Sequence, residues 1–306
     1  MAQRPDLRVR IGSLELSNPI LAASGTFGYG VEFAHLIDLN GLGGIVTKGL
    51  SPQPMAGAPG PRLAETASGM VNAVGLQNIG VRAFVAEKLP ALREYQTAVI
   101  ANVFGSSFRE YLEVIEVLEQ AEGVAGYELN ISCPNTDSGG REFGVDPKVT
   151  ARLVGEARKV AKRPLWVKLS PNVTDIAAIA RAAEQAGADA LTVANTYPAM
   201  AVDVRTRRSR LGRLSGGLSG PAIKPITLKL VYETSQAVGI PVIGLGGVET
   251  AEDVAEYLLV GASAVQVGTA HFADPCASLK LVKGVEQLAT NLKINNINEL
   301  TRSLRQ

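Results

Sequence analysis

The sequence predicts a (β/α)8 barrel, the TIM-barrel fold, on three observations. Short apolar runs rich in Val, Ile and Leu alternate along the chain with longer segments of helical period. These runs number eight, which is the strand count of the barrel. The last two runs end in glycine-rich turns, IGLGGVE and VQVGTAH, and such barrels commonly build a phosphate site after strands seven and eight.

Each expected strand is an almost continuous apolar run, the pattern of strands that are buried on both faces of a parallel sheet. A doubly wound open sheet is the alternative architecture for alternating strands and helices. The strand count and the position of the glycine turns favour the barrel. The expected strands are Ile20–Ser24, Gly44–Lys48, Ala98–Phe104, Tyr127–Ser132, Leu165–Ser170, Ala190–Asn195, Pro241–Leu245 and Ala264–Gly268.

Segments between these strands carry helix signals. Phe108–Gln120 places apolar side chains on one stripe and Glu residues opposite. Asp146–Ala161 begins with Asp-Pro, which favours a helix start. Thr174–Ala186 and Thr250–Val260 are each followed by a glycine, the residue that most favours the position after a helix.

Three segments depart from the alternation. Leu7–Pro19 predicts a short β-hairpin that turns at Gly12-Ser13 and covers the bottom of the barrel. Gly49–Asn78 and Tyr197–Gly220 are long strand-to-helix excursions, and ordered loops of that length at the C-terminal face usually carry function. The chain shows no linker or internal repeat, so residues 1–306 are expected to form a single domain.

The composition excludes several classes of protein. Lys and Arg total 30 against 29 Asp and Glu, and a net charge of +1 gives no bulk attraction for nucleic acid. The absence of a long apolar run or a secretory signal predicts a cytoplasmic protein that does not enter membranes. Two cysteines fit a reducing compartment and are too few for a self-contained iron–sulfur cluster.

Polar groups recur at the ends of consecutive expected strands. A buried amide or ammonium is costly unless it is paired, and a planar polar ligand would pair a whole ring of them. With a phosphate held on the glycine turns, such a ligand matches FMN, and Lys168 near its pyrimidine edge would stabilise developing negative charge. The groups are Lys48, Asn102, Asn130, Lys168 and Asn195 with Thr196.

The glycine turns Leu245–Val248 and Gly268-Thr269 could bind phosphate through backbone amides alone. Turn formation by itself is the alternative interpretation, since glycine supplies positive φ anywhere. A Rossmann NAD site is not expected, because the chain has no G-x-G-x-x-G and Glu249 stands where the third glycine after Gly244 and Gly246 would be.

Cys133 is the best candidate for a catalytic base or nucleophile. It follows an expected strand in a polar loop at the catalytic end of the barrel. A buried small hydrophobe is the usual role of a lone cysteine, and that role fits Cys276 better. His35, in an apolar stretch interpreted as helical, is interpreted as structural, and His271 as a residue at a helix start or one that supports the residues in contact with a ligand. The sequence shows no serine triad or metal cluster.

Five motifs occur in order along the chain: NAVGLQN at Asn72–Asn78, ELNISCPN at Glu128–Asn135, Asn195-Thr196, GGLSGP at Gly216–Pro221 and IGLGGV at Ile243–Val248. Together they resemble the class 1 dihydroorotate dehydrogenases over about Leu7 to Pro275, and most closely the catalytic subunit of the NAD-dependent B subtype. The resemblance implies oxidation of (S)-dihydroorotate to orotate in pyrimidine (UMP) biosynthesis. Class 2 enzymes are also similar but use serine in place of the cysteine.

The resemblance also implies roles for individual residues. Cys133 would take the C5 proton while C6 delivers hydride to FMN, with Lys168 assisting. The flavin would be bound by Ser24, Lys48, Gly49, Asn102, Asn130, Lys168, Ala194, Gly220, Gly246, Gly247, Gly268 and Thr269. The substrate would be bound by Lys48, Asn72, Ala73, Val74, Gly75, Leu76, Asn130, Asn195 and Thr196.

Likeness to the B subtype implies a partner subunit that carries FAD and a [2Fe–2S] cluster, arranged around a homodimer of this chain in a heterotetramer. The chain lacks a dinucleotide-binding fingerprint and has few cysteines, which agrees with the placement of FAD and the cluster on a separate subunit. Three alternatives stay open: a fumarate-reducing class 1A enzyme, a dihydropyrimidine dehydrogenase-like module, and a flavin-binding protein without catalysis. The arginines between Arg205 and Arg213 are interpreted as a solvated loop in preference to a docking surface or an anion gate.

Overall fold

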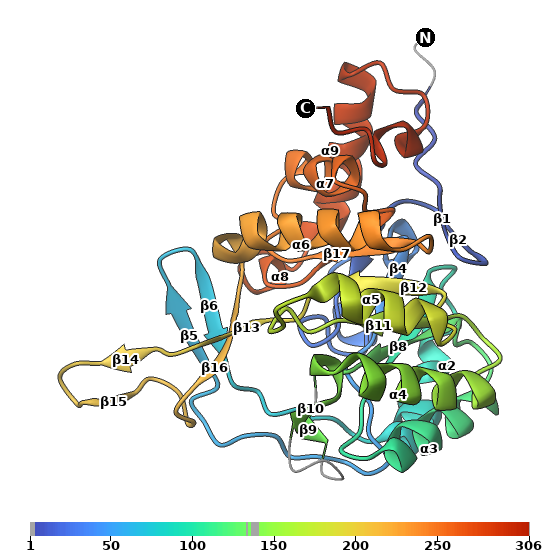
Figure 1. The fold of residues 1–306 in the computed structure, drawn as a ribbon. Coiled ribbons are helices and arrows are strands. Elements are labelled where there is room, and N and C mark those ends of the chain that lie inside the picture. Colours follow the sequence, from blue (N-terminus) through green and yellow to red (C-terminus); the bar gives the residue numbers. More distant parts are fainter. Residues whose placement is uncertain (1–3, 133, 136–140, 306) are drawn as a thin grey trace.

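The computed structural model describes residues 4–132, 134–135 and 141–305. Within these ranges, eight parallel strands close into a barrel in which each strand pairs with the next along the chain and the last pairs with the first (Figure 1). The barrel and all eight expected strands are therefore confirmed. The strands are β3 (Ile20–Ala22), β4 (Gly44–Val46), β7 (Ala98–Val103), β8 (Gly126–Asn130), β11 (Leu165–Lys168), β12 (Ala190–Val193), β17 (Val242–Leu245) and β18 (Ala264–Val267).

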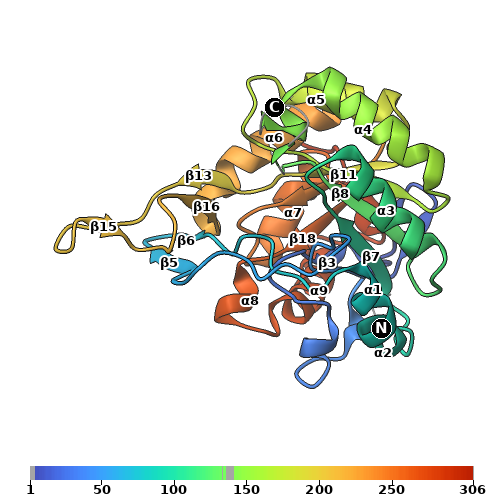
Figure 2. The same ribbon diagram turned by 90° about the horizontal axis from the view of Figure 1, so that it is seen from below.

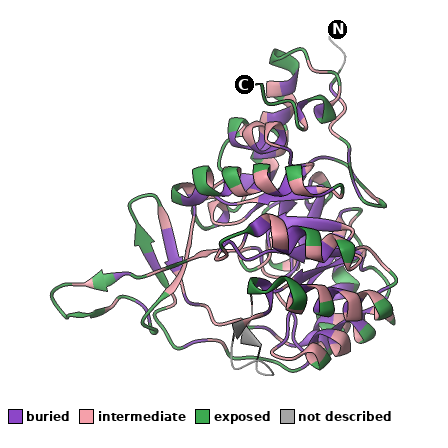
Figure 3. Cartoon of the chain, viewed as in Figure 1, coloured by how far each residue is buried: buried purple, intermediate pink, exposed green. Residues whose placement is uncertain are grey.

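Helices surround the barrel, as the two views in Figures 1 and 2 together show. Their inner faces are buried and their outer faces exposed (Figure 3), which is the burial pattern that their amphipathic sequences predict. The main helices are α3 (Phe108–Glu119), α4 (Pro147–Val160), α5 (Ile176–Gln185), α6 (Lys224–Ala237), α7 (Ala251–Leu259) and α9 (Ala277–Asn291). The segment after the first long excursion forms α1 (Val81–Ala83), the π-helical η3 (Phe84–Lys88) and α2 (Leu89–Leu92).

Side-chain caps explain where the predicted helices begin. Ser107, Asp146 and Asp175 each accept a hydrogen bond from a backbone N–H in the first turn of α3, α4 and α5. Thr250 begins α7 with a capping box that it shares with Asp253. The four predicted helices are confirmed within one or two residues at each end.

The N-terminal hairpin is also confirmed. β1 (Val9–Ile11) pairs antiparallel with β2 (Leu14–Leu16), and the turn between them includes Gly12. A methyl group on Gly12 would lie 3.5 Å from Asp189, the residue that immediately precedes β12. The hairpin therefore lies against the N-terminal end of the barrel, opposite the end where the strands finish.

The two long excursions join in one antiparallel sheet, which the sequence did not predict. The first provides β5 (Leu63–Thr66) and β6 (Gly69–Asn72), and the second provides β13 (Tyr197–Ala199) and β16 (Gly216–Ser219). β16 pairs with β6, so the strand order is β13-β16-β6-β5. A methyl group on Gly217 would collide with the Thr196 hydroxyl, so glycine permits β16 to lie close to the residue that precedes β13.

An arm formed by β14 (Val202–Asp203) and β15 (Arg208–Ser209) projects from this sheet away from the barrel (Figure 1, left). Arg205, Arg207, Arg208, Arg210 and Arg213 are all exposed, which agrees with a solvated loop and does not distinguish it from a docking surface.

The remaining elements are short. They are η1 (Val31–Phe33), η2 (Leu39–Gly41), β9 (Pro134–Asn135), β10 (Arg141–Glu142), η5 (Phe143–Val145), η6 (Pro221–Ile223), α8 (Ala270–Ala273) and η7 (Ile297–Leu300). One expectation is wrong here: His35 lies exposed in a turn between η1 and η2 and not in a helix. Among the described residues, no helix has both the length and the apolar character that crossing a bilayer requires.

The first testable prediction concerns the cap of α5. Asp175 accepts a hydrogen bond from the Ala178 N–H, so Asp175→Ala leaves that amide without its protein acceptor. The free energy of unfolding should fall by about 1 kcal/mol. Asp175→Asn is the matched control, because its amide oxygen caps equally well. Urea unfolding measures both variants, and an alanine variant as stable as the wild type would contradict the assignment of the cap.

Candidate active site

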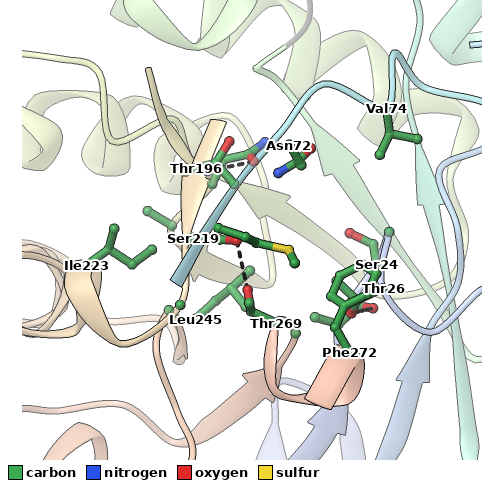
Figure 4. A pocket seen from close by; sticks show the side chains of 18 of the residues that line it. Ser24, Thr26, Asn72, Val74, Thr196, Ser219, Ile223, Leu245, Thr269 and Phe272 are labelled. Atoms are coloured by element: carbon green, nitrogen blue, oxygen red, sulfur yellow. Dashed lines mark hydrogen bonds between the residues drawn. The ribbon is translucent and has the colours of Figure 1, made fainter. Parts of the chain in front are cut away.

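A cavity of about 320 Å³ lies at the C-terminal end of the barrel, beneath the sheet formed by the two excursions. It is lined by residues at or just after the end of every barrel strand and by residues of β5, β6 and β16. Figure 4 shows Ser24, Leu245 and Thr269 on the barrel side, with Asn72 and Thr196 on the sheet side. The volume falls in the range of sites that hold small ligands or cofactors.

Every described residue that the sequence predicted to bind cofactor or substrate lines this cavity. The cofactor set is Ser24, Lys48, Gly49, Asn102, Asn130, Lys168, Ala194, Gly220, Gly246, Gly247, Gly268 and Thr269. The substrate set is Lys48, Asn72, Ala73, Val74, Gly75, Leu76, Asn130, Asn195 and Thr196. Their individual roles stay predictions. Cys133 lies outside the described residues.

Lys168 forms part of the cavity floor. Its side chain points into the barrel from the end of β11, is only 5% exposed, and donates a hydrogen bond to the Ser24 hydroxyl at 3.1 Å. Burial lowers the pKa of Lys168, and the negative charge of Glu128 acts in the opposite direction. The pKa of Lys48, at the end of β4, is lowered by burial and by the nearby Arg62 guanidinium.

Asparagine side chains on the walls are held by neighbouring groups. Asn195 donates from Nδ2 to Asn130 Oδ1 at 3.2 Å and accepts from the Thr196 N–H at 2.8 Å. Asn72, at the end of β6, donates to the Gly217 carbonyl of β16 at 3.1 Å. These bonds fix the direction in which each amide presents its free atoms to a ligand.

The glycine turns meet at the opposite end of the cavity. Gly247 has φ 67°, and a methyl group there would lie 2.8 Å from the Gly220 carbonyl, so the turn requires glycine. Tyr257 donates its hydroxyl proton to the Gly246 carbonyl at 2.7 Å and holds the turn in place. The Thr269 hydroxyl donates to the Ser219 hydroxyl at 2.8 Å across the same space (Figure 4).

Several lining residues were not assigned individually to the site from the sequence. They are Ala23, Gly25, Thr26, Leu63, Met70, Phe104, Ser219, Ile223, Leu245, Val248, Glu249, Ala270 and Phe272. Ser219 and Val248 lie inside the motifs GGLSGP and IGLGGV, so their motifs could have indicated them. Leu63 and Met70 enter the site only because β6 pairs with β16, and no local pattern reveals that pairing.

His271 lies at the start of a helix, as expected. It lies in α8 between Ala270 and Phe272, which line the cavity, but its own ring is buried against Phe27 at 4.8 Å between ring centroids. Its Nε2 is 2.8 Å from the Ser278 hydroxyl. Burial lowers the pKa of His271 to about 4.

The fold and the cavity define this chain as a barrel enzyme with its site at the carboxyl ends of the strands. In the part of the chain that the structure describes, no group of three or more His, Cys, Asp or Glu residues could hold a metal ion.

Comparison with known proteins gives the family. Residues 6–289 match the family model described as dihydroorotate dehydrogenase, and the chain belongs to this family.

Relatives match over nearly the whole length of the chain. One from Solibacter usitatus, named "Putative dihydroorotate dehydrogenase A (fumarate)", is 56% identical over 98% of this chain and 99% of its own. One from Thermodesulfovibrio yellowstonii is 50% identical over 99% of this chain and 100% of its own, and one from Geotalea daltonii is 50% identical over 99% of each chain. Both are named "Dihydroorotate dehydrogenase B (NAD(+)), catalytic subunit". The predicted family and its activity, dihydroorotate oxidation in pyrimidine biosynthesis, are therefore confirmed.

The second prediction concerns acid stability. His271 is neutral in the fold, whereas an unfolded histidine titrates near 6.5, so the unfolded state binds more protons between about pH 6.5 and 4. The free energy of unfolding should fall as the pH is lowered through this interval, by about 2–3 kcal/mol from this residue. His271→Gln should lose this part of the pH dependence, measured by urea unfolding at several pH values.

The control for that measurement is His35→Gln, which changes the exposed histidine of the chain. It should keep the full acid dependence of the wild type. If His271→Gln also kept it, the buried ring would not be the origin of the effect.

Proposed function

We propose that this chain is the catalytic subunit of an NAD⁺-dependent dihydroorotate dehydrogenase that binds FMN in the cavity and dihydroorotate between the flavin and the sheet of the excursions. The observation that carries this proposal is the convergence, in one cavity, of the glycine turns, a buried lysine and the asparagine amides. The glycine turns suit the phosphate of FMN, the buried lysine suits its flavin ring, and the asparagine amides suit the substrate.

The glycine end suits a phosphate. The turns around Gly246 and Gly268 present backbone amides, and the hydroxyls of Ser219 and Thr269 add donors beside them. Backbone amides and hydroxyls bind phosphate without requiring a cation. Because a side chain at Gly247 would press against Gly220, the turn keeps this space open for a ligand.

The floor suits the flavin ring. Lys168 supplies a positive charge and Asn102 a buried amide, while Ala194 and Leu245 supply apolar surface. When bound, FMN supplies the acceptor for the hydride that leaves C6 of dihydroorotate. The Lys168 ammonium, held in place by Ser24, stabilises the negative charge that develops in this step.

The walls above the floor suit dihydroorotate. The backbone and side chains of Asn72–Leu76 descend from β6, and Asn195 with Thr196 follows β12. Asn130 and Asn195 are joined by a hydrogen bond, so two amides act as one rigid pair toward the pyrimidine ring. Lys48 adds a cation suited to the substrate carboxylate.

The base in this proposal is Cys133, and its assignment rests on the sequence. β8 ends at Asn130, which lines the cavity, and Cys133 follows three residues later. Its thiolate would remove the C5 proton from the face of the substrate opposite the hydride acceptor.

A second candidate is a fumarate-reducing enzyme that works without a partner. The name of the Solibacter usitatus relative favours it, whereas the names of the relatives from Thermodesulfovibrio and Geotalea favour the NAD⁺-linked form. In the preferred form, the FAD and the [2Fe–2S] cluster reside on a separate electron-transfer subunit, and this chain forms the homodimeric core of a heterotetramer.

The third prediction identifies the cofactor. The purified chain should be yellow and should release one FMN per chain, and no FAD, on denaturation. Gly247→Ala should weaken FMN binding at least about tenfold, because the added methyl forces the phosphate turn to shift. Gly155→Ala is the control, since a methyl group there meets no atom within 4 Å. Release of FAD from the wild-type chain would disprove the assignment.

The fourth prediction tests the base. Cys133→Ala should still bind FMN and orotate, but dihydroorotate should bleach its flavin roughly 10²–10⁴-fold more slowly in stopped-flow experiments. Cys133→Ser should recover part of the rate at high pH, because a serine hydroxyl is a poor base near neutrality. Cys276→Ala, at the start of α9, should react at the wild-type rate. A Cys133→Ala rate within a few-fold of wild type would place the base elsewhere.

The fifth prediction separates the two candidate acceptors. The isolated chain should transfer electrons from dihydroorotate to artificial dyes but should reduce neither NAD⁺ nor fumarate efficiently. Adding the electron-transfer subunit should restore NAD⁺ reduction. Rapid fumarate reduction by the chain alone would select the second candidate.

A further inference from the structure

A carboxylate lies inside the barrel, directly beneath the cavity floor. Glu128, in the middle of β8, is 0% exposed. Its Oε1 accepts a hydrogen bond from Asn102 Nδ2 at 2.8 Å, and its Oε2 accepts from Thr192 Oγ1 at 2.7 Å and Gln266 Nε2 at 2.5 Å. These three donors come from β7, β12 and β18, so the carboxylate joins four barrel strands.

The strand register places this carboxylate one layer below the proposed flavin site. Glu128 pairs with Trp166, and Asn130 pairs with Lys168 two positions further along both strands. Since residues two apart on a strand point to the same side, all four side chains point into the barrel. Glu128 therefore lies immediately below the layer that contains Lys168 and Asn130.

Hydrogen bonding alone does not account for this group. The interior of such a barrel is usually filled by branched apolar side chains, and a buried carboxylate is costly without an opposite charge. The three donors are neutral, so they orient the carboxylate without balancing its charge. A cation nearby is the physical feature that would offset the cost.

Lys168 is the cation with the right position. The negative charge of Glu128 raises the pKa of Lys168 against the lowering caused by burial. The neighbouring elements otherwise face Lys168 with neutral groups: Ser24 after β3, Asn102 on β7 and Thr192 on β12. The other cation of the cavity, Lys48, is under the influence of Arg62, and Glu142 is bound to the Ser170 hydroxyl.

We propose that Glu128 is a positioning residue for the dehydrogenase reaction: its buried carboxylate is the counter-charge that keeps Lys168 as an ammonium under the flavin. The inference rests on the proposed function for the task of Lys168, whereas the coupling of the two charges is a property of the barrel itself. If Glu128 only joined strands through hydrogen bonds, its substitution would not change the protonation of Lys168. The two roles therefore predict different results when Glu128 and Lys168 are substituted together.

The first test is a double-mutant cycle on the stability of the purified full chain. Glu128→Gln leaves Lys168 without its counter-charge, Lys168→Met leaves Glu128 without its cation, and the double variant leaves neither. The unfolding equilibrium constant of the double variant should be about tenfold smaller than the product of the two single effects predicts. Independent effects would overturn the proposal, even if the chain oxidises dihydroorotate as proposed.

The same variants cover the case in which Glu128→Gln fails to fold. The double variant should then fold, because it contains no unpaired buried charge. If both variants failed to fold while Lys168→Met folded, the hydrogen bonds of Glu128 would be its essential contribution, and the counter-charge role would be wrong.

The pH dependence of the free energy of unfolding tests directly whether Glu128 acts as the counter-charge of Lys168. Loss of the counter-charge lowers the pKa of Lys168 in the folded state further. At pH values between this lowered pKa and the ordinary pKa of lysine, the unfolded state binds more protons than the folded state. Unfolding free energy should therefore rise with pH, and in Glu128→Gln the rise should begin about one pH unit or more below that of the wild type. The double variant should lack this rise.

The last test is kinetic and uses the flavin-bound chain. The rate at which dihydroorotate bleaches the flavin should decrease at alkaline pH in both the wild type and Glu128→Gln. In Glu128→Gln this decrease should occur at a pH about one unit or more lower than in the wild type. Glu119→Gln is the matched control: its carboxylate accepts the Lys162 N–H near the N-terminal end of the barrel. An unchanged alkaline limb in Glu128→Gln, alongside an unchanged control, would refute the role in catalysis.

Discussion

Closure of the parallel sheet is the constraint on which the rest of this molecule depends. Once eight strands close into a ring, every second side chain must point into a shared interior, and each strand must end at the same rim. Lys168, Asn130 and Asn102 lie close together at this rim because β7, β8 and β11 pair side by side, although the three residues are distant in sequence. The polar interior beneath them is tolerated because the same register brings donors from three other strands to Glu128.

The cavity needs a second, weaker assembly to be complete. The barrel rim supplies its floor and the end formed by the glycine turns, and the sheet formed by β6 and β16 supplies its upper wall. The two parts differ in how they are held: the barrel strands are buried on both faces, whereas the excursion sheet has a small core of Ala64, Val71, Ala73, Ala201 and Leu211. The wall formed by the excursion sheet is therefore the less strongly packed part of the cavity.

Sequence reasoning succeeded where the signal was local. Apolar runs and capping residues such as Asp146 identified strands and helices almost to the residue, because burial and hydrogen bonding act along the chain over short distances. It failed for His35, whose apolar neighbours belong to turns, and for the pairing of the two excursions. It also gave Glu128 no role of its own, because a strand residue reveals its partners only once the register of the neighbouring strands is known.

The pairing of β6 with β16 has a consequence for the diversification of such enzymes. Asn72 and Gly217 are bonded across the site although 145 residues separate them. Glycine at Gly216 permits the close approach of one excursion to the other, because a methyl group there would collide with the Asn72 carbonyl oxygen, so a bulkier residue on one requires a change on its counterpart. Transplanting one excursion from a relative would leave an unmatched strand edge. New substrate preferences on this scaffold should therefore arise through paired exchanges of both segments.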